Sequence, residues 1–108
     1  MKVITDAEFE NEVLSASNTT PVVIDFFAEW CSPCRQLLPL LDEAETANAG
    51  KVKIVKMDID NSPDTPAKFN VRGIPTLIMF KNGEAVANNS GGMSKSKLTD
   101  WLAQALAK

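Results

Sequence analysis

The segment that most constrains the fold is residues 22–28, which are apolar except for Asp25. A strand that is apolar on both of its faces is typical of the centre of a sheet that is covered on both sides. The chain then has helical content from Cys31 to about Ala49. A buried strand that leads directly into a helix predicts an α/β domain with this strand at its centre.

The rest of the chain alternates between strand-like and helix-like apolar patterns, without an internal repeat or a linker. We expect further strands at residues 2–4, 52–59, 76–80 and about 85–87. Asn82-Gly83 is a strong hairpin signal, so the last strand should run antiparallel to its neighbour and the sheet should be mixed. Ser94 is expected to cap the last helix, and we assign Trp101, on the apolar stripe of that helix, to the core.

Local signals predict where the other helices begin. Thr5 and Glu8 form a capping box that opens a first helix. Ser62 is interpreted as an N-cap and Pro63 as the first residue of a short helix that ends at about residue 69. Pro39 falls inside the helix that follows the cysteines, where it predicts a kink.

Cys31 and Cys34 are the only cysteines, and they stand at the junction between the central strand and its helix. Their spacing allows an intramolecular disulfide, and the start of a helix offers unpaired backbone N–H groups and a partial positive charge. Both features of the helix start favour a thiolate over a thiol. The pair therefore predicts reversible redox chemistry with one sulfur primed to attack.

Three other interpretations of the cysteine pair compete with this one. A structural staple is weak, because closing a loop of four residues contributes only about 2 kcal/mol, against about 3 kcal/mol for fifteen residues. A zinc site needs four ligands, and the chain has no histidine and no further cysteine, so we expect no metal site. Two unrelated buried thiols would need neither the preceding strand nor Pro33 between them. The redox interpretation is favoured.

Asp25 is a carboxylate within a segment that is expected to be buried. An isolated buried charge is costly, so the group must be paired, hydrated or neutral, and desolvation should raise its pKa. One interpretation makes Asp25 the proton acceptor for the second thiol, because the attacking sulfur must be a thiolate. The other places Asp25 at a strand edge, in contact with water. Lys56 is the candidate charge partner, although lysines on strands are usually only solvated.

The composition predicts a single domain over residues 1–108, because 44% of the residues are hydrophobic and 23% are charged. The net charge of −3 and the lack of a Lys/Arg cluster argue against nucleic acid or an anionic membrane as a partner. No apolar stretch approaches the length of a membrane helix, and the N-terminal residues do not resemble a signal peptide. We therefore expect a cytoplasmic protein.

Two motifs carry a family resemblance: residues 25–34, Asp-Phe-Phe-Ala-Glu-Trp-Cys-Ser-Pro-Cys, and residues 71–77, Val-Arg-Gly-Ile-Pro-Thr-Leu. With these motifs the chain resembles the thioredoxin family over essentially its whole length. The resemblance implies the thioredoxin fold, in which a central five-stranded mixed β-sheet is flanked by four α-helices. It also implies an exposed, nucleophilic Cys31, a buried resolving Cys34 and a proton-transfer role for Asp25.

The resemblance further implies a cis bond between Ile74 and Pro75, beside the cysteines; without it, Pro75 would indicate only a tight turn. In this arrangement the backbone of Ile74 is free to pair with an extended substrate, and Pro75 has no N–H to approach the sulfurs. The same resemblance predicts an apolar docking rim for partner proteins. The residues expected in this docking rim are Trp30, Pro33, Ile74, Pro75, Gly91, Gly92 and Met93.

Three residues depart from the family pattern. Ser32 stands where thioredoxins usually have glycine, and its hydroxyl and its stiffer backbone are expected to change the redox potential in opposite directions. Phe27 stands where a second tryptophan is common, and Ser90 replaces an apolar residue of the docking rim. These changes bear on the selection of partners, including the reductase.

The predicted function is that of a general protein-disulfide reductase, which exchanges its Cys31/Cys34 dithiol for a substrate disulfide. By resemblance, the electrons come from NADPH through a flavin-dependent thioredoxin reductase, so no bound cofactor is expected. Further expected partners are disulfide-containing proteins of the ribonucleotide reductase, peroxiredoxin and methionine sulfoxide reductase types. The chain is expected to be a monomer that serves electron transport and redox homeostasis. The alternatives are a disulfide oxidase or isomerase with a shifted potential, and a non-redox protein-binding module.

Overall fold

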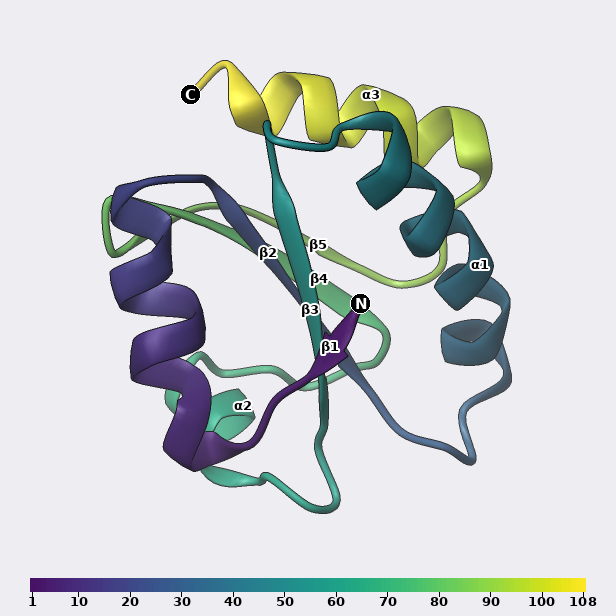
Figure 1. Ribbon diagram of the computed structural model, residues 1–108. Coiled ribbons are helices and arrows are strands. Elements are labelled where there is room, and N and C mark those ends of the chain that lie inside the picture. Colours follow the sequence, from purple (N-terminus) through teal and green to yellow (C-terminus); the bar gives the residue numbers. More distant parts are fainter.

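The computed structural model describes residues 1–108 and contains one five-stranded sheet, with the strand order β1-β3-β2-β4-β5 (Figure 1). The strands are β1 (Lys2–Val3), β2 (Val22–Phe27), β3 (Lys53–Asp58), β4 (Thr76–Lys81) and β5 (Glu84–Ser90). Strands β1 and β2 run parallel to β3, whereas β4 is antiparallel to β2 and to β5. The expected mixed sheet is confirmed.

Helices cover both faces of the sheet, as Figure 1 shows. Helices α1 (Ser32–Ala47) and α3 (Lys95–Leu106) lie on one face. The other face is covered by α2 (Asp64–Lys68) and by a first helical segment, which comprises η1 (Asp6–Glu8), η2 (Glu10–Ser15) and η3 (Ala16–Asn18). With these four helical elements around the sheet, the predicted thioredoxin fold class is confirmed.

The centre of the molecule is β2, of which all six residues are buried. Because alternate side chains of a strand point to opposite faces, β2 contributes to two separate cores. Val22, Ile24 and Phe26 pack under the first helical segment, whereas Val23 packs with the buried leucines of α1 and α3. The apolar run in the sequence was therefore a sound indicator of a strand buried on both faces.

The hairpin between β4 and β5 forms at the predicted turn. Asn82 and Gly83 both have positive φ angles, of 52° and 78°, which is the backbone conformation that Asn-Gly turns favour. Strand β5 is longer than the predicted residues 85–87, since Asn88, Asn89 and Ser90 also pair with β4. These residues have low strand propensity, and the ladder with β4 overrides it.

The first helix forms where it was predicted, but it is not a regular α-helix, because it consists of a 3-10 turn, a π-helical stretch and a second 3-10 turn within residues 6–18. Contacts with distant segments hold both ends of this stretch. At its C-terminal end, the Ser17 hydroxyl donates to the Leu14 carbonyl and accepts the Gly83 N–H, while Asn82 N–H donates to the Ser17 carbonyl. We attribute the irregular helix to these non-local constraints, which local capping signals do not report.

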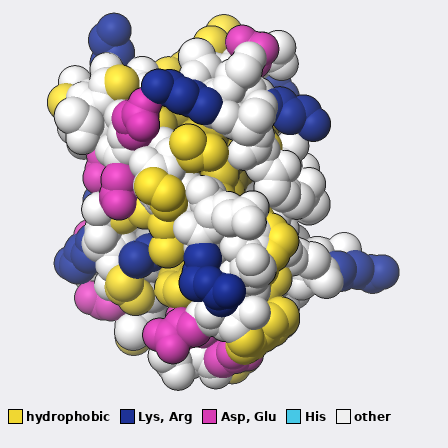
Figure 2. Space-filling model, turned by 90° about the vertical axis from the view of Figure 1, so that its right-hand side faces the viewer, with side chains coloured by type: hydrophobic (Ala, Val, Ile, Leu, Met, Phe, Trp, Pro, Cys, Tyr) yellow, Lys and Arg dark blue, Asp and Glu magenta, His cyan; other side chains and the backbone are white.

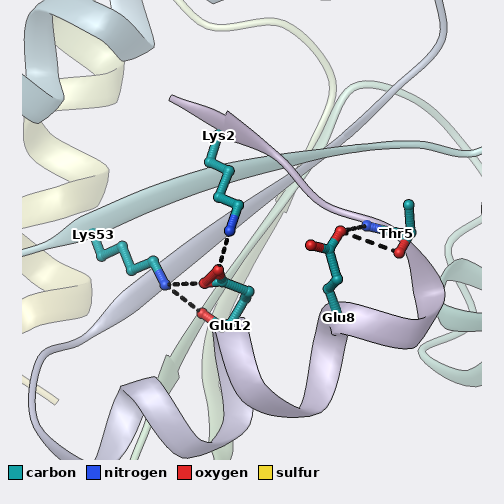
Figure 3. Close-up of polar contacts among 5 residues, drawn as sticks. All are labelled: Lys2, Thr5, Glu8, Glu12 and Lys53. Atoms are coloured by element: carbon teal, nitrogen blue, oxygen red, sulfur yellow. Dashed lines mark hydrogen bonds and ion pairs between the residues drawn. The ribbon is translucent and has the colours of Figure 1, made fainter.

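Ion pairs fix the first helical segment to the sheet, as Figure 3 shows. The Glu12 carboxylate accepts hydrogen bonds from Lys2 of β1 and, at 2.9 Å, from Lys53 of β3. These hydrogen bonds lower the pKa of Glu12 to about 2, and the bond from Lys2 has the largest effect. At the start of the segment, the Glu8 carboxylate accepts from the Thr5 N–H at 2.9 Å, and the predicted capping box is confirmed.

The start of α2 differs from the prediction, because neither Ser62 nor a residue of α2 itself caps this helix. The Asp6 carboxylate instead accepts the N–H groups of Asp64, at 3.0 Å, and Thr65, at 2.8 Å, and the Thr65 hydroxyl. Ser62 uses its hydroxyl to accept the Asp6 N–H, and Pro63 precedes the helix as its N-cap residue. Burial raises the pKa of Asp6, but these hydrogen bonds outweigh it and leave the pKa below its ordinary value.

The other two helices begin as expected. The Ser94 hydroxyl accepts the Lys97 N–H at 3.1 Å and caps α3. Pro39 lies inside α1, which continues through it to Ala47. Trp101 is half-buried against the core under α1 and α3, in agreement with its predicted role, and donates from its indole nitrogen to the Asn88 carbonyl.

A shallow groove of about 440 Å³ lies between α1 and α3, and an ion pair between Glu43 and Lys95 lies beside it. Leu40, Leu98 and Leu102 are among the apolar residues that line it. Figure 2 shows this side of the molecule, where apolar side chains run down the middle among acidic and basic ones. The two signs of charge are interspersed on this face, so it presents no large field of one sign.

We predict that Asp6→Ala destabilises the protein by about 1 to 2 kcal/mol, because it removes the acceptor that caps α2 from a distant segment. Denaturant unfolding at pH 7 measures this loss. The loss should shrink as the pH falls below about 4, since a carboxylate with a lowered pKa contributes stability only while it is ionised. Asn11→Ala, at an exposed position of the same segment, is the control and should change stability by less than about 0.5 kcal/mol.

Candidate active site

The two cysteines form a disulfide at the first turn of α1, and their Cα atoms are 5.3 Å apart. Cys31 is the N-cap residue of α1, with an extended backbone, and Cys34 lies in the first turn. Ser32 and Pro33 occupy the first helical positions, where the missing N–H of proline costs no helical hydrogen bond. The Cys34 N–H donates to the Cys31 sulfur at 3.2 Å, so a free backbone donor of the helix start points at this sulfur.

The two sulfurs differ in accessibility, but less than predicted. Cys34 is completely buried, as expected, whereas Cys31 is 5% exposed rather than open to solvent. Phe27 and Ala28 pack around the disulfide, with Ile59 and Ile74 at the edge of the cluster. This apolar packing, which involves three separate segments of the chain, is why the helix start is more covered than its sequence suggested.

The bond between Ile74 and Pro75 is cis, as the family resemblance implied. The Ile74 carbonyl oxygen lies 3.9 Å from the Cys31 sulfur. On the other side, the Gly91 N–H donates to the Pro75 carbonyl at 2.8 Å. Gly91 has a φ of +100°, which other residues rarely adopt, so the turn after β5 depends on glycine here.

The residues expected in the docking rim differ in how deeply they are buried. A Cβ atom on Gly92 would lie 3.9 Å from the Cβ of Pro33, so the turn after β5 abuts the start of α1. Met93 is half-buried and packs against the core below α1 and α3. Trp30 is 68% exposed. The structure therefore brings the turn after β5 and the Ile74-Pro75 bond to the disulfide, and leaves Trp30 as the largest exposed apolar side chain next to it.

Two residues at the site, Asp60 and Thr76, could not be predicted from the sequence. The Asp60 carboxylate accepts the indole N–H of Trp30 at 2.9 Å and so fixes the orientation of this exposed side chain. The Thr76 hydroxyl donates to the Gly73 carbonyl and lies 3.4 Å from the Ser90 hydroxyl, which ties the segment before Pro75 to β5. Trp30 and Asp60 are 30 residues apart, and Thr76 and Ser90 are 14 residues apart, so no local pattern signals either contact.

Asp25 is completely buried, and neither of its carboxylate oxygens has a hydrogen-bond partner. The alternative that places it at a water-accessible strand edge was therefore wrong, because β2 is covered by β3 and β4 on both sides. Desolvation raises the pKa of Asp25 to about 7, and the charge of Lys56 opposes this rise. A carboxyl group with this pKa can both accept and release a proton near neutral pH.

Lys56 lies directly opposite Asp25 in the ladder between β2 and β3. It is half-buried and forms no ion pair, so it is neither a contact partner of Asp25 nor a fully solvated lysine. Its ammonium nitrogen is 5.5 Å from the centre of the Phe27 ring. Lys56, Phe27, Leu38 and Arg35 line a cavity of about 440 Å³ beside the disulfide.

Ser32, the residue between the cysteines that departs from the family pattern, is exposed. Its hydroxyl makes no hydrogen bond to the Cys31 sulfur in the disulfide form.

No group of three or more cysteine, aspartate or glutamate side chains is arranged to hold a metal ion. No helix is both long enough and apolar enough to cross a membrane.

A disulfide between two cysteines three residues apart at a helix start, next to a cis-proline segment and a buried acid, is typical of the thiol-disulfide oxidoreductases. Comparison with known proteins narrows this class. The thioredoxin family model matches residues 1–104. The chain is 49% identical to a thioredoxin of Rhodospirillum rubrum over 102 residues, which cover 94% of this chain and 96% of that protein.

Two further thioredoxins give the same result. The Pseudomonas aeruginosa protein is 48% identical over 92% of this chain and 90% of its own length. The Haemophilus influenzae protein is 46% identical over 94% of this chain and 92% of its own length. The chain belongs to the thioredoxin family. It is a thiol-disulfide oxidoreductase that acts as a protein-disulfide reductase, with disulfide-containing proteins as substrates and a reductase as its electron donor.

We predict that Asp25→Asn stabilises the oxidised protein at pH 8 by up to about 4 kcal/mol and changes its stability little at pH 4. The folded-state pKa of about 7 is higher than that of the unfolded chain, so the native state binds more protons between the two values. Wild-type stability should therefore fall as the pH rises from about 4 to above 7. Guanidinium unfolding across this range measures the effect. Equal slopes for the wild type and the Asn variant would contradict the assignment.

Proposed function

We propose that Cys31 is the attacking thiolate and Cys34 the resolving thiol of this reductase. The difference in burial supports this order, because Cys31 is 5% exposed whereas Cys34 is completely buried. In the reduced state, the Cys34 N–H that now contacts the Cys31 sulfur is placed to stabilise a thiolate there. Cys34, packed beneath it, is better placed to attack a sulfur that is already bound to Cys31.

The proposed reaction has two exchange steps. The Cys31 thiolate attacks one sulfur of the substrate disulfide, a mixed disulfide forms, and the other substrate sulfur leaves as a thiolate that takes up a proton. Cys34 then loses its proton and attacks the Cys31 sulfur, which releases the second substrate sulfur. Two electrons pass to the substrate, and the Cys31–Cys34 disulfide is left.

We propose that Asp25 accepts the proton of Cys34 in the second step. Asp25 shares its face of β2 with Val23 and Phe27, which pack against α1 and the disulfide respectively. Its pKa of about 7 suits this role, because a base with an ordinary carboxyl pKa would be a weaker proton acceptor. We assign Lys56 the role of limiting how far burial raises that pKa.

We further propose that partner proteins dock on the rim around the disulfide, formed by Trp30, Pro33, Ile74, Pro75, Gly91, Gly92 and Met93. The exposure of Trp30 supports this, because a large exposed apolar side chain on a small protein is typical of a binding surface. An extended substrate segment would pair with the backbone of Ile74.

By family membership we propose that a flavin-dependent thioredoxin reductase supplies electrons from NADPH, so that the chain binds no cofactor of its own. We propose substrates of the ribonucleotide reductase, peroxiredoxin and methionine sulfoxide reductase types. We also propose that the protein works as a cytoplasmic monomer in electron transport. The mixed charges and the net charge of −3 are in keeping with protein partners rather than nucleic acid.

We predict that Cys34→Ala traps substrates as mixed disulfides on Cys31, because the second exchange step is removed. Non-reducing gel electrophoresis and mass spectrometry with a disulfide-containing protein measure the trapped species. Cys31→Ser, the matched control, should trap nothing and lose turnover. Turnover that survives without Cys31 would contradict the mechanism, and a partner held equally by both variants without a covalent bond would favour the binding-module alternative.

We predict that the reduction potential of the Cys31/Cys34 couple lies near the value of roughly −270 mV that is typical of thioredoxins. Equilibration in a defined thiol buffer, with the oxidation state determined by alkylation, measures it. A potential between about −180 and −120 mV would instead indicate an isomerase or an oxidant. Ser32→Gly, measured in parallel, gives the sign of the serine's contribution.

A further inference from the structure

Lys56 and Asp25 are positioned to form an ion pair, yet they do not form one. They are opposite each other on adjacent parallel strands, so their side chains project from the same face of the sheet. A buried carboxylate next to a lysine is normally stabilised by direct contact. Neither oxygen of Asp25, however, has a hydrogen-bond partner, and Lys56 has no ion pair. The Lys56 ammonium group lies over the ring of Phe27 instead.

The ring of Phe27 is the group that contacts this ammonium. The Lys56 nitrogen lies 5.5 Å from the ring centre, within the distance of about 6 Å at which a cation is attracted to an aromatic face. Phe27 follows Asp25 by two residues and therefore lies on the same face of β2. It is only 8% exposed, and its other contacts are with the disulfide cluster. The ring is thus fixed between Lys56 and the two cysteines.

We propose that Phe27 is a positioning residue for the proton acceptor: its ring holds the Lys56 ammonium beside the Asp25 carboxyl group rather than against it. A lysine in direct contact would keep Asp25 ionised and make it a weaker base. A lysine held at a distance still limits how far burial raises the pKa of Asp25. The inference rests on the proposed proton-transfer role of Asp25 for its mechanistic meaning, whereas the positioning itself can be measured without turnover.

Three other charged side chains line the cavity, and the one cation among them, Arg35, is already engaged. Asp58, opposite Phe27 on β3, accepts the Asp60 N–H at 2.9 Å. Arg35 of α1 donates to the Glu29 carbonyl at 2.6 Å, and the exposed Glu29 side chain lies on the loop at the cavity edge. From β4 the residue that faces Asp25 is the apolar Leu77, and the α1 residues packed on this face, Cys34, Leu37 and Leu41, carry no charge. Lys56 is therefore the one cation positioned to respond when Phe27 changes.

The test is the pKa of the Asp25 carboxyl group, followed by carbon NMR in the disulfide form of the whole chain. In Phe27→Leu the aromatic face is lost but apolar bulk remains, so the ammonium is free to approach the carboxylate. We expect the pKa to fall by about half a unit to one unit, which corresponds to the usual strength of a cation–π contact. Phe27→Trp keeps an aromatic face and should retain the wild-type value. An unchanged or raised pKa in Phe27→Leu would overturn the proposal.

A double-mutant cycle separates positioning from simple hydration of the site. Lys56→Met alone should raise the pKa of Asp25, because it removes the opposing charge. When Phe27→Leu is then added to Lys56→Met, the pKa should stay at the value of Lys56→Met alone. An equal fall in this background would show that water entering beside the smaller side chain is responsible, and would overturn the proposal.

Phe69→Leu is a matched control, because Phe69 also has a lysine, Lys68, over its ring at 5.9 Å, but it packs on the opposite face of the sheet. It should leave the pKa of Asp25 unchanged, and a shift as large as that of Phe27→Leu would count against a local effect. The rate of mixed-disulfide resolution in Asp25→Asn is measured separately. An unchanged rate there would overturn the proton-transfer role of Asp25 but not the positioning of Lys56 by Phe27.

Discussion

Neither oxygen of the Asp25 carboxylate meets a hydrogen-bond donor, and the desolvation of this group raises its pKa. The strand that carries Asp25 is buried along its whole length between β3 and β4, with helices on both faces. The pKa of about 7 therefore arises from the apolar groups that exclude water, rather than from a specific contact to the carboxyl group. Any change in core packing near β2 is thus also a change in the acid–base properties of the site.

The sheet topology assembles the rest of the site from segments far apart in the sequence. The pairing of β2 with β4 brings the Ile74-Pro75 segment to the end of β2 at which the cysteines follow. The pairing of β4 with β5 then places Gly91 against Pro75. The backbone groups around the sulfurs lie in short segments that directly adjoin the ends of these ladders, since β4 begins at Thr76 and β5 ends at Ser90. The backbone around the disulfide is therefore positioned by the strand pairing.

Features that depend on local sequence could be predicted, and those that depend on distant partners could not. The buried strand β2, the hairpin at Asn82-Gly83 and the Ser94 cap each arise from neighbouring residues, and all three were found. The cap of α2 could not be found, because its acceptor is Asp6, which is 58 residues away from Asp64. At the site, the sequence identified the cysteines and Asp25 as candidates. It did not reveal that Phe27 would hold Lys56, since this contact exists only once β2 and β3 are paired in register.

The arrangement of Asp25, Lys56 and Phe27 combines two opposing requirements. A carboxylate paired with lysine would stabilise the fold at neutral pH, but its low pKa would make it a poor proton acceptor. A carboxyl group without a nearby cation would be a stronger base, but burial would then destabilise its ionised form further. With the ammonium over an aromatic ring, the pKa of Asp25 is about 7, so the carboxyl group is partly ionised at neutral pH and costs some stability there. The ring that sets this balance also packs on the disulfide, so the redox and acid–base parts of the site share one side chain.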